Sequence, residues 1–319
     1  MRFFCAGVMV LCAAQAAAQS DSYPNRPLRF IVPYAAGGNG DIVSRILAQK
    51  LVAQIGQQVV IDNRGGAGGN IGAEIAARAA PDGYTFMLGT NTHAINMSLF
   101  TKLPYDLQRD FAPVSRTTSA PMVLIVHPSL PVKTVKEFIA FARSQPGKLN
   151  YASGGSGSSA HVISELFAAM AGVRLTHVAY KGVAQATTDL IAGQIQMSFN
   201  STATALAHMQ AGRVRGLGIS TAARSSAAPG VPTIAESGLP GFDASIWQGV
   251  FVPARTPPSI IERLNREITT ALGTSEVKDQ LGVQGLDALP STPQQFAAFV
   301  TEEIAKWAKV IKVSGAKVD

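Results

Sequence analysis

The sequence predicts an α/β protein made of two similar units that follow one another along the chain. Short apolar runs alternate with amphipathic segments through most of the 319 residues, and the same alternation starts again near the middle. This pattern favours a parallel sheet with helices on both faces. A chain of roughly 300 residues also usually forms two domains. No repeat of roughly 20–50 residues is present, so a solenoid is not expected.

Residues 1–18 have the layout of a secretory signal peptide. Arg2 is followed by an apolar stretch at residues 3–11 and by the small residues Ala16–Ala18. The apolar stretch is too short to cross a bilayer. Cleavage after the small residues would remove both cysteines of the chain, so the mature protein needs neither a disulfide nor a cysteine-bound metal. The sequence therefore predicts an exported protein.

The charge pattern argues against nucleic acid as a partner. The chain has 27 basic and 20 acidic residues, a net charge of +7, but the basic residues are scattered. Those near the start, Arg26, Arg29, Arg45 and Lys50, do not alternate with aromatic residues. Scattered surplus charge is typical of a solvated surface. A mildly basic field favours small anions instead.

The first unit begins with a strand at Leu28–Val32 and a turn-rich segment at residues 33–40. Apolar residues then recur at helical spacing, and Asp41 stands where a helix N-cap belongs. The unit continues with a strand at Gln58–Ile61, a helix at Asn70–Ala79 and a strand at Tyr84–Leu88.

The second unit repeats this alternation. Its strands are expected at Pro121–His127, Leu149–Ala152, up to Tyr180, Ile195–Phe199 and Arg215–Ser220. Its helices are expected at Thr134–Arg143, from about Ile163 to Met170, and at Ala184–Ala192. In the tail, the pattern predicts a buried strand around Trp247 and helices at Pro257–Leu272 and Thr292–Val313.

Three glycine-rich loops each follow a predicted strand and open a helix, at Ala35–Asp41, Gly89–His93 and Ser153–His161. Such loops expose backbone N–H groups at a helix N-terminus, which is an anion site that needs no cationic side chain. In α/β sheets, ligands gather beyond the carboxyl ends of the strands. Turn geometry alone would explain glycine in any one loop, but three loops across both units favour a binding cleft.

The glycine- and serine-rich residues of the third loop do not match the sequence motifs of the enzyme classes that they superficially resemble. Gly155-x-Gly157-x-x-Ala160 fits a loose dinucleotide fingerprint, but no acidic residue follows about twenty residues later to hold the ribose. Ser156 lacks the G-x-S-x-G context of a hydrolase nucleophile. A serine hydrolase using one of the serines 156, 158 and 159 with His161 is the remaining enzymatic alternative. The five histidines are dispersed, so we expect no metal and no cofactor.

Two further positions have a structural and a functional interpretation. Tyr180-Lys181-Gly182 could present a phenol and a cation to an acid, although an exposed lysine at a turn is the commoner case. Trp247 could form the floor of a ligand pocket or pack in the core.

The stretch DNRGGAGGNIGAEIAARAAPDGY, residues Asp62–Tyr84, resembles the signature of the Bug family, the periplasmic solute receptors of tripartite tricarboxylate transporters. Further stretches resemble the family in its order: VPYAAGGNGD, HAIN, LPYDLQRDF, YASGGSGSSAH, AYKG, TDLIAGQIQMSF, PTIAESGLPGF and WQGVFVPARTP. Together they span nearly the whole mature chain.

The resemblance implies a type II periplasmic-binding-protein fold, with two Rossmann-like lobes joined by a hinge of two crossover strands. It implies a discontinuous first lobe, residues 19–121 and 246–319, and a second lobe of residues 122–245. The crossings would lie near Pro121 and Ser245.

The resemblance also implies which residues touch the ligand, mainly through backbone groups and bridging waters. The first loop contributes Tyr34, Ala35, Ala36, Gly37, Gly38 and Asp41, and the second contributes Thr90, Asn91 and Thr92. The other lobe contributes Ser153, Gly154, Gly157, Ser158, Ser159, His161, Tyr180, Lys181, Gly182 and Asn200, with Trp247 or Tyr34 shaping the pocket.

Many relatives carry aspartate where Asn200 stands, and the loss of that charge argues against an amino group on the ligand. We therefore expect a monomeric, non-catalytic, periplasmic receptor that captures a small carboxylate between its lobes. The family context implies delivery to the membrane components of a tripartite tricarboxylate transporter. A sensor that presents its closed form to a membrane signalling partner is the alternative.

Overall fold

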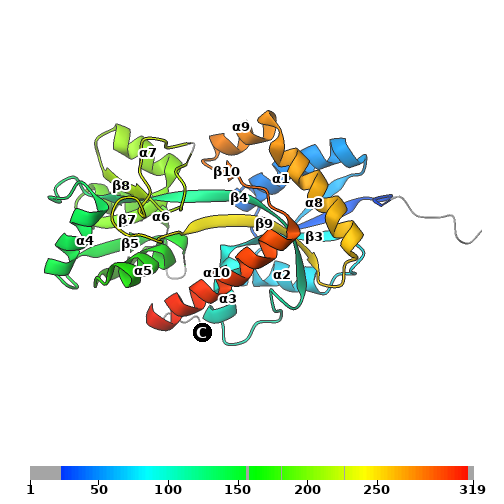
Figure 1. Cartoon of the computed structure of the whole chain (residues 1–319), viewed down its shortest axis with the longest axis horizontal. Coiled ribbons are helices and arrows are strands. Elements are labelled where there is room, and N and C mark those ends of the chain that lie inside the picture. Colours follow the sequence, from blue (N-terminus) through cyan, green and yellow to red (C-terminus); the bar gives the residue numbers. More distant parts are fainter. Residues whose placement is uncertain (1–22, 156–157, 181, 226, 315–319) are drawn as a thin grey trace, which may run out of the picture.

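The computed structural model describes residues 23–155, 158–180, 182–225 and 227–314 (Figure 1). The predicted signal peptide, Gly157 and Lys181 lie outside these residues. The described chain forms two α/β lobes that lie side by side, with long strands passing between them.

Lobe 1 contains the first and the last elements of the described chain. Its strands are β1 (Leu28–Val32), β2 (Val59–Asn63), β3 (Thr85–Thr90) and the short β10 (Asp287–Ala288). Its helices are α1 (Asn39–Ile55), α2 (Asn70–Ala77), α3 (Asn91–Leu99), α8 (Pro258–Gly273), α9 (Ser275–Val283) and α10 (Pro293–Ser314), with a 3-10 turn at Ala67–Gly69. β1 pairs in parallel with β2 and β3. Phe30 of β1 and Leu47 of α1 are fully buried in the same cluster, as the alternation of apolar residues predicts.

Lobe 2 contains the middle of the chain. Its strands are β5 (Asn150–Ser153), β6 (Thr176–Ala179), β7 (Met197–Ser201) and β8 (Arg215–Ile219), and its helices are α4 (Val135–Ser144), α5 (Ser159–Ala171), α6 (Val183–Ile191) and α7 (Thr202–Gln210). β5 pairs in parallel with β6 and β7. Gly172, with a φ of 61°, ends α5 in the left-handed conformation that glycine adopts at little cost.

Two antiparallel strands cross between the lobes, β4 (Phe111–Val126) and β9 (Ser245–Pro253) (Figure 1). They pair from Phe111 opposite Pro253 to Pro121 opposite Ser245. Beyond Pro121, β4 pairs with β7 and β8. On its other edge, β9 pairs with β3 from Gln248 to Phe251. The order is β2-β1-β3-β9-β4-β7-β5-β6, with β8 and β10 on β4.

The expected parallel sheet is therefore a mixed one, because the crossover strands run antiparallel to their neighbours. The lobe limits expected at residues 121 and 245 coincide with the last β4–β9 pair and stay a prediction.

Helix α10 packs on α3 and β4 in lobe 1 and reaches α5 in lobe 2. Its Trp307 is fully buried in the largest core cluster, together with Trp247 of β9. None of the described helices has the length and apolar character needed to span a membrane.

Candidate ligand-binding cleft

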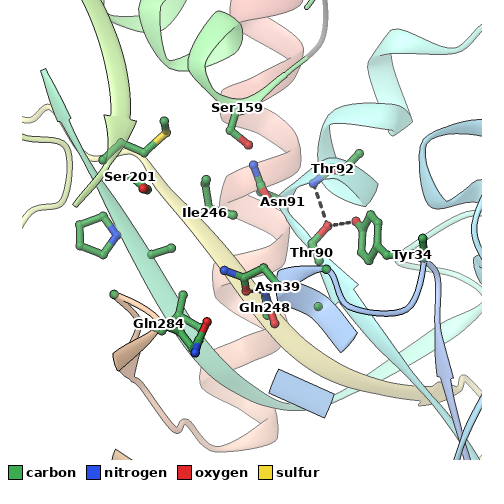
Figure 2. A pocket seen from close by; sticks show the side chains of 18 residues that line it. Tyr34, Asn39, Thr90, Asn91, Thr92, Ser159, Ser201, Ile246, Gln248 and Gln284 are labelled. Carbon is green, nitrogen blue, oxygen red and sulfur yellow. Dashed lines mark hydrogen bonds between the residues drawn. The ribbon is translucent and has the colours of Figure 1, made fainter. Parts of the chain in front are cut away.

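A cavity of about 370 Å³ lies where the two lobes meet the crossover strands (Figure 2). Its size is in the range of small-molecule sites. The lining residues come from both lobes and from both crossover strands: Tyr34, Ala35, Gly38, Asn39, Gly40, Thr90, Asn91, Thr92, Ala120, Pro121, Met122, Ser159, Ser201, Ile246, Gln248, Gln284, Gly285 and Leu286.

Four helices begin at this cavity. The N-cap residues are Gly38 for α1, Thr90 for α3, Ser158 for α5 and Ser201 for α7, and each cap or the residue next to it lines the cavity. A helix N-terminus has backbone N–H groups without intrahelical partners and the positive end of the helix dipole. The cleft is therefore suited to an anion.

The N-terminus of α1 has no side-chain cap. Gly38 makes no capping hydrogen bond, and Gly38, Asn39 and Gly40 all line the cavity. The first N–H groups of this 17-residue helix are therefore available to a ligand.

Asp41 stabilises the loop before α1 through hydrogen bonds, without lining the cavity. Its Oδ2 accepts the backbone N–H of Gly37 at 2.9 Å and Nε–H of Arg45 at 2.9 Å, and its Oδ1 accepts Nδ2–H of Asn63 at 3.0 Å. Gly37 has a φ of 81°, which glycine adopts without strain. The hydrogen bond from Arg45, with those from Gly37 and Asn63, outweighs burial and lowers the pKa of Asp41 to about 2. Asp41 is thus an ionised support of the loop, and it does not line the cavity.

The loop that opens α3 is fixed by a hydrogen-bond network. Oγ1 of Thr90 accepts the backbone N–H of Thr92 at 3.2 Å and lies 2.5 Å from the Tyr34 hydroxyl (Figure 2). The backbone N–H of Thr90 donates to Nδ1 of His93 at 3.1 Å, which completes a capping box. Burial lowers the pKa of His93 to about 4, so its ring is neutral at pH 7.

Two polar atoms on the cleft wall have no hydrogen-bond partner among the described residues. They are Nδ2 of Asn91, whose side chain is 1% exposed, and Oε1 of Gln248, which is 4% exposed. Leaving a buried polar atom unpaired costs about 1–3 kcal/mol. Both atoms are buried although their residues line the cavity, so each reaches a ligand only after its side chain turns towards the cavity.

The floor of the cleft is apolar and comes from the hinge. β4 contributes Ala120, Pro121 and Met122, β9 contributes Ile246, and Leu286 follows α9. No described residue that lines the cleft carries a charged side chain. An anion here would meet helix ends and amides, and a carbon skeleton would meet the hinge.

The structure brings together part of the predicted site. The predicted residues that line the cavity are Tyr34, Ala35, Gly38, Thr90, Asn91, Thr92 and Ser159. The predicted residues that lie in the same loops without lining it are Ala36, Gly37, Asp41, Ser153, Gly154, Ser158 and His161.

The predicted residues of the β6–α6 turn do not line the cavity. The Tyr180 hydroxyl donates to Oδ2 of Asp189 at 2.7 Å, and Gly182 is the N-cap of α6. Burial and the neighbouring Asp189 raise the pKa of Tyr180 to about 12. Two further residues predicted for this lobe, Gly157 and Lys181, lie outside the described residues.

Trp247 is placed in the core and not at the cavity. Its ring is fully buried against Phe296 and Phe299, and Nε1–H donates to Oε2 of Glu303 at 2.8 Å. Side chains alternate between the faces of a strand, so the neighbours of Trp247 point the other way. Those neighbours, Ile246 and Gln248, line the cavity.

Asn200 is also buried inside lobe 2. Its Nδ2–H donates to Oγ1 of Thr187 at 2.9 Å, and its Oδ1 accepts the hydroxyl of Ser198 at 3.1 Å. The next residue, Ser201, lines the cavity instead. The reason is again alternation, since β7 ends at Ser201 and α7 begins there.

The third predicted loop is held by stacked rings. Oγ of Ser153 lies 2.7 Å from Nε2 of His177, and the rings of His177 and His161 stack with centroids 4.0 Å apart. Burial, with a contribution from His161, lowers the pKa of His177 to about 4. The Ser158 hydroxyl accepts the backbone N–H of His161 at 3.4 Å, which is a helix cap.

The predicted contacts left out two residues of the first predicted loop, Asn39 and Gly40. They also missed the lining residues that come from other parts of the chain: Ala120, Pro121, Met122, Ser201, Ile246, Gln248, Gln284, Gly285 and Leu286. The period of two around Trp247 and the strand-to-helix junction at Ser201 are signals that could have found three of them. Nothing local marks the segment at residues 284–286, which the pairing of β10 with β4 brings to the cleft.

Comparison with known proteins places the chain in a family. The model described as "Tripartite tricarboxylate transporter family receptor" (TctC) matches residues 43–316. Protein BugT of Bordetella pertussis is 38% identical over 315 residues, which cover 98% of this chain and 97% of that protein.

Two similar structures come from Rhodopseudomonas palustris. One protein, solved with adipate, is 36% identical, with a TM-score of 0.74 and coverage of 92% of this chain and 98% of that one. MatC, solved with bound malate, is 34% identical, with a TM-score of 0.71 and coverage of 91% and 100%. The chain therefore belongs to the Bug (TctC) family of tripartite tricarboxylate transporter receptors.

Proposed function

We propose that this protein is a non-catalytic periplasmic receptor that binds a small carboxylate in the cleft and passes it to the membrane components of a tripartite tricarboxylate transporter. The observation that carries the proposal is the convergence of the N-termini of α1, α3, α5 and α7 on one cavity. Anions are the ligands that helix N-termini favour.

The carboxylate is held without a cationic side chain from the described lining. The uncapped N-terminus of α1 supplies the donors, and Nδ2 of Asn91 adds one when its side chain turns towards the ligand. A hydrogen bond to a charged acceptor contributes about 1.5–3 kcal/mol. Two or three such bonds, with the helix dipoles, give useful affinity for one carboxylate group.

The remaining volume receives a short carbon skeleton. The apolar floor at Pro121, Met122 and Ile246 lies beside the polar helix ends. The adipate and malate bound by the two relatives from R. palustris are both small dicarboxylates and support this ligand class.

Binding is coupled to lobe closure. The cleft is lined from lobe 1 by residues such as Thr92 and from lobe 2 by Ser159 and Ser201, so a ligand that contacts both lobes favours the closed arrangement. We place the hinge at the Pro121–Ser245 pair, with lobes at 19–121 plus 246–319 and at 122–245, and we propose that the receptor acts as a monomer. A membrane signalling protein that reads the closed form is the second candidate partner.

A thermal-shift screen tests this function. The purified protein, unfolded and refolded to remove retained ligand, is heated with small mono-, di- and tricarboxylates and with the matching amides. An acid at 100 times its Kd stabilises the folded state by about 2.7 kcal/mol. We expect a shift with at least one acid and none with its amide. An equal response to the amides, or no response to any acid, would contradict the proposal, as would labelling of a serine by a fluorophosphonate with turnover of an ester.

A further inference from the structure

A hydrogen bond joins the two lobes outside the ligand cavity. The hydroxyl of Ser225, in the loop after β8 of lobe 2, donates to Oδ2 of Asp287 in β10 of lobe 1 at 3.1 Å. Neither residue lines the cavity, and Ser225 is 3% exposed. In Figure 1, α9 and β10 lie on the side of lobe 1 that faces α7 and β8 of lobe 2. The bond therefore links the lobes without any contact to the ligand.

The segment at residues 284–288 is a fixed part of lobe 1. The backbone N–H of Leu286 donates to the carbonyl oxygen of Leu281 in α9 at 3.0 Å. Asp287 is paired with Ser119 of β4, on the lobe 1 side of the hinge. The segment therefore moves with lobe 1 when the lobes separate.

Ser225 is fixed in the same way to lobe 2. Its Oγ accepts the backbone N–H of Ala227 at 3.2 Å. The preceding residue, Arg224, forms an ion pair with Glu236 of lobe 2, with 3.0 Å between Nε and Oε2. The bond from Ser225 to Asp287 thus joins two supports that are each built within one lobe, and it breaks when the lobes move apart.

A second contact between the lobes is apolar and lies beside this bond. A Cβ built on Gly285 would lie 3.5 Å from Cβ of Ala203 in the first turn of α7, which is an ordinary van der Waals distance. Gly285 lines the cavity, and so does Ser201, the N-cap of α7. This wall of the cavity is therefore complete only while the 284–288 segment lies against lobe 2.

We infer that the hydrogen bond from Ser225 to Asp287 is a latch that holds the lobes closed, so that part of the closing free energy comes from the protein and not from the ligand. This inference rests on the proposed function, since it concerns the closure of the same cleft. The apparent Kd of a receptor is its intrinsic Kd divided by the fraction of molecules in the binding-competent state. The latch raises that fraction and tightens the binding of every ligand by the same factor. Asp287 is thus a positioning residue, because it lies outside the cavity lining.

Calorimetry and solution scattering test the latch with Ser225→Ala, Asp287→Ala and the double variant. Titration of the refolded full-length mature protein with succinate, malate and adipate gives the affinities, and small-angle X-ray scattering gives the radius of gyration without ligand. We expect each single variant to bind every acid that the unmodified protein binds about tenfold more weakly, with unchanged ratios between the acids. The radius of gyration without ligand should increase, because the open arrangement becomes more populated.

The double variant and two controls separate the latch from local damage. Because the two residues act through one shared bond, the double variant should lose no more affinity than either single variant. Asp287→Asn keeps an acceptor for the Ser225 hydroxyl and should retain most of the affinity. Arg224→Ala removes the adjacent ion pair, which lies within lobe 2, and should leave the affinities within about twofold. Each variant is first checked for a cooperative thermal transition.

The outcomes distinguish the latch from the function on which it rests. Unchanged affinities in both single variants, losses that add up in the double variant, or losses that differ from acid to acid would overturn the latch and leave the receptor function intact. If none of the acids binds the unmodified protein, the receptor function is lost, and scattering still decides the latch. A larger radius of gyration in both ligand-free single variants supports it, and an unchanged radius overturns it.

Discussion

Trp247 in the crossover strand β9 donates its indole N–H to Glu303 in α10, with 2.8 Å between Nε1 and Oε2. The same oxygen accepts the indole N–H of Trp307 at 2.9 Å, and Glu303 also forms an ion pair with Lys306. Glu303 is 4% exposed and both tryptophans are fully buried. One carboxylate thus joins α10 to the strand whose opposite face lines the cleft.

Replacing this carboxylate by an apolar group should destabilise the fold. Glu303→Leu leaves two indole N–H groups unpaired in the core, so we expect a loss of about 2–5 kcal/mol in the free energy of unfolding. Glu303→Gln keeps an acceptor and should lose less than half as much. Urea unfolding followed by the fluorescence of the two tryptophans measures both. A Glu303→Leu protein as stable as the unmodified one would show that the shared acceptor has no energetic role.

The free energy of unfolding should decrease as the solution is acidified, in a pH window set by His93. Its folded pKa of about 4 lies below the unfolded value of about 6.5, so between these values only the unfolded state binds the proton. Stability is unaffected above pH 6.5 and decreases towards pH 4, by roughly 2–3 kcal/mol from this residue.

The variant His93→Gln tests that window. Glutamine three residues after Thr90 can still accept the N–H that His93 accepts, as in a capping box. We expect a smaller loss of stability between pH 6.5 and 4 than in the unmodified protein. A remaining slope is expected because burial also lowers the pKa of His177. Identical pH profiles for the two proteins would rule His93 out as the cause.

The first loop should tolerate a side chain that blocks the ligand. Gly38 has a φ of −78° and lines the cleft, and a Cβ there would lie 3.4 Å from the carbonyl oxygen of Ala35. Gly38→Val should therefore bind the carboxylate at least tenfold more weakly with nearly unchanged stability. Ser158→Ala, which removes the cap of α5 outside the lining, should cost about 1 kcal/mol of stability and weaken binding less. Ligand-dependent thermal shifts compare them, and tight binding by Gly38→Val would place the ligand elsewhere.

Packing behind the hinge should be sensitive to a single methyl group. A Cβ on Gly249 would lie 2.2 Å from the Phe296 ring and 3.0 Å from the carbonyl oxygen of Ser115. Gly249→Ala should lower the free energy of unfolding by about 1–3 kcal/mol. Gly282→Ala, in α9 with open space around it, should stabilise by up to about 1 kcal/mol. Urea midpoints that moved in the same direction for both would contradict the clash.

Local pattern predicted most elements well, because apolar periodicity reflects which face is buried. The strand expected at Leu28–Val32 is β1, and the helix expected at Thr134–Arg143 is α4 within one residue. The first half of β4 was not predicted. Its buried residues include Ser115, Thr117 and Thr118, which look like a polar loop and form a strand only by pairing with the distant β9.

The site was predicted where it depends on single loops and missed where it depends on topology. The loops at Gly38 and Thr90 open helices and therefore carry a local signal of anion binding. Gln248 and Leu286 reach the cleft through strand pairing across more than a hundred residues, which no local pattern records. Trp247 shows the same limit, since a shift of one residue along a strand exchanges the core face for the cleft face.

A crystal structure of the protein with the acid that gives the largest thermal shift tests the central claim most directly. We predict a carboxylate oxygen within hydrogen-bond distance of the backbone N–H groups at the start of α1 and of Nδ2 of Asn91, with Ser159 and Ser201 closed over the ligand. An acid bound outside the cleft, or one whose carboxylate points away from these helix N-termini, would contradict the account.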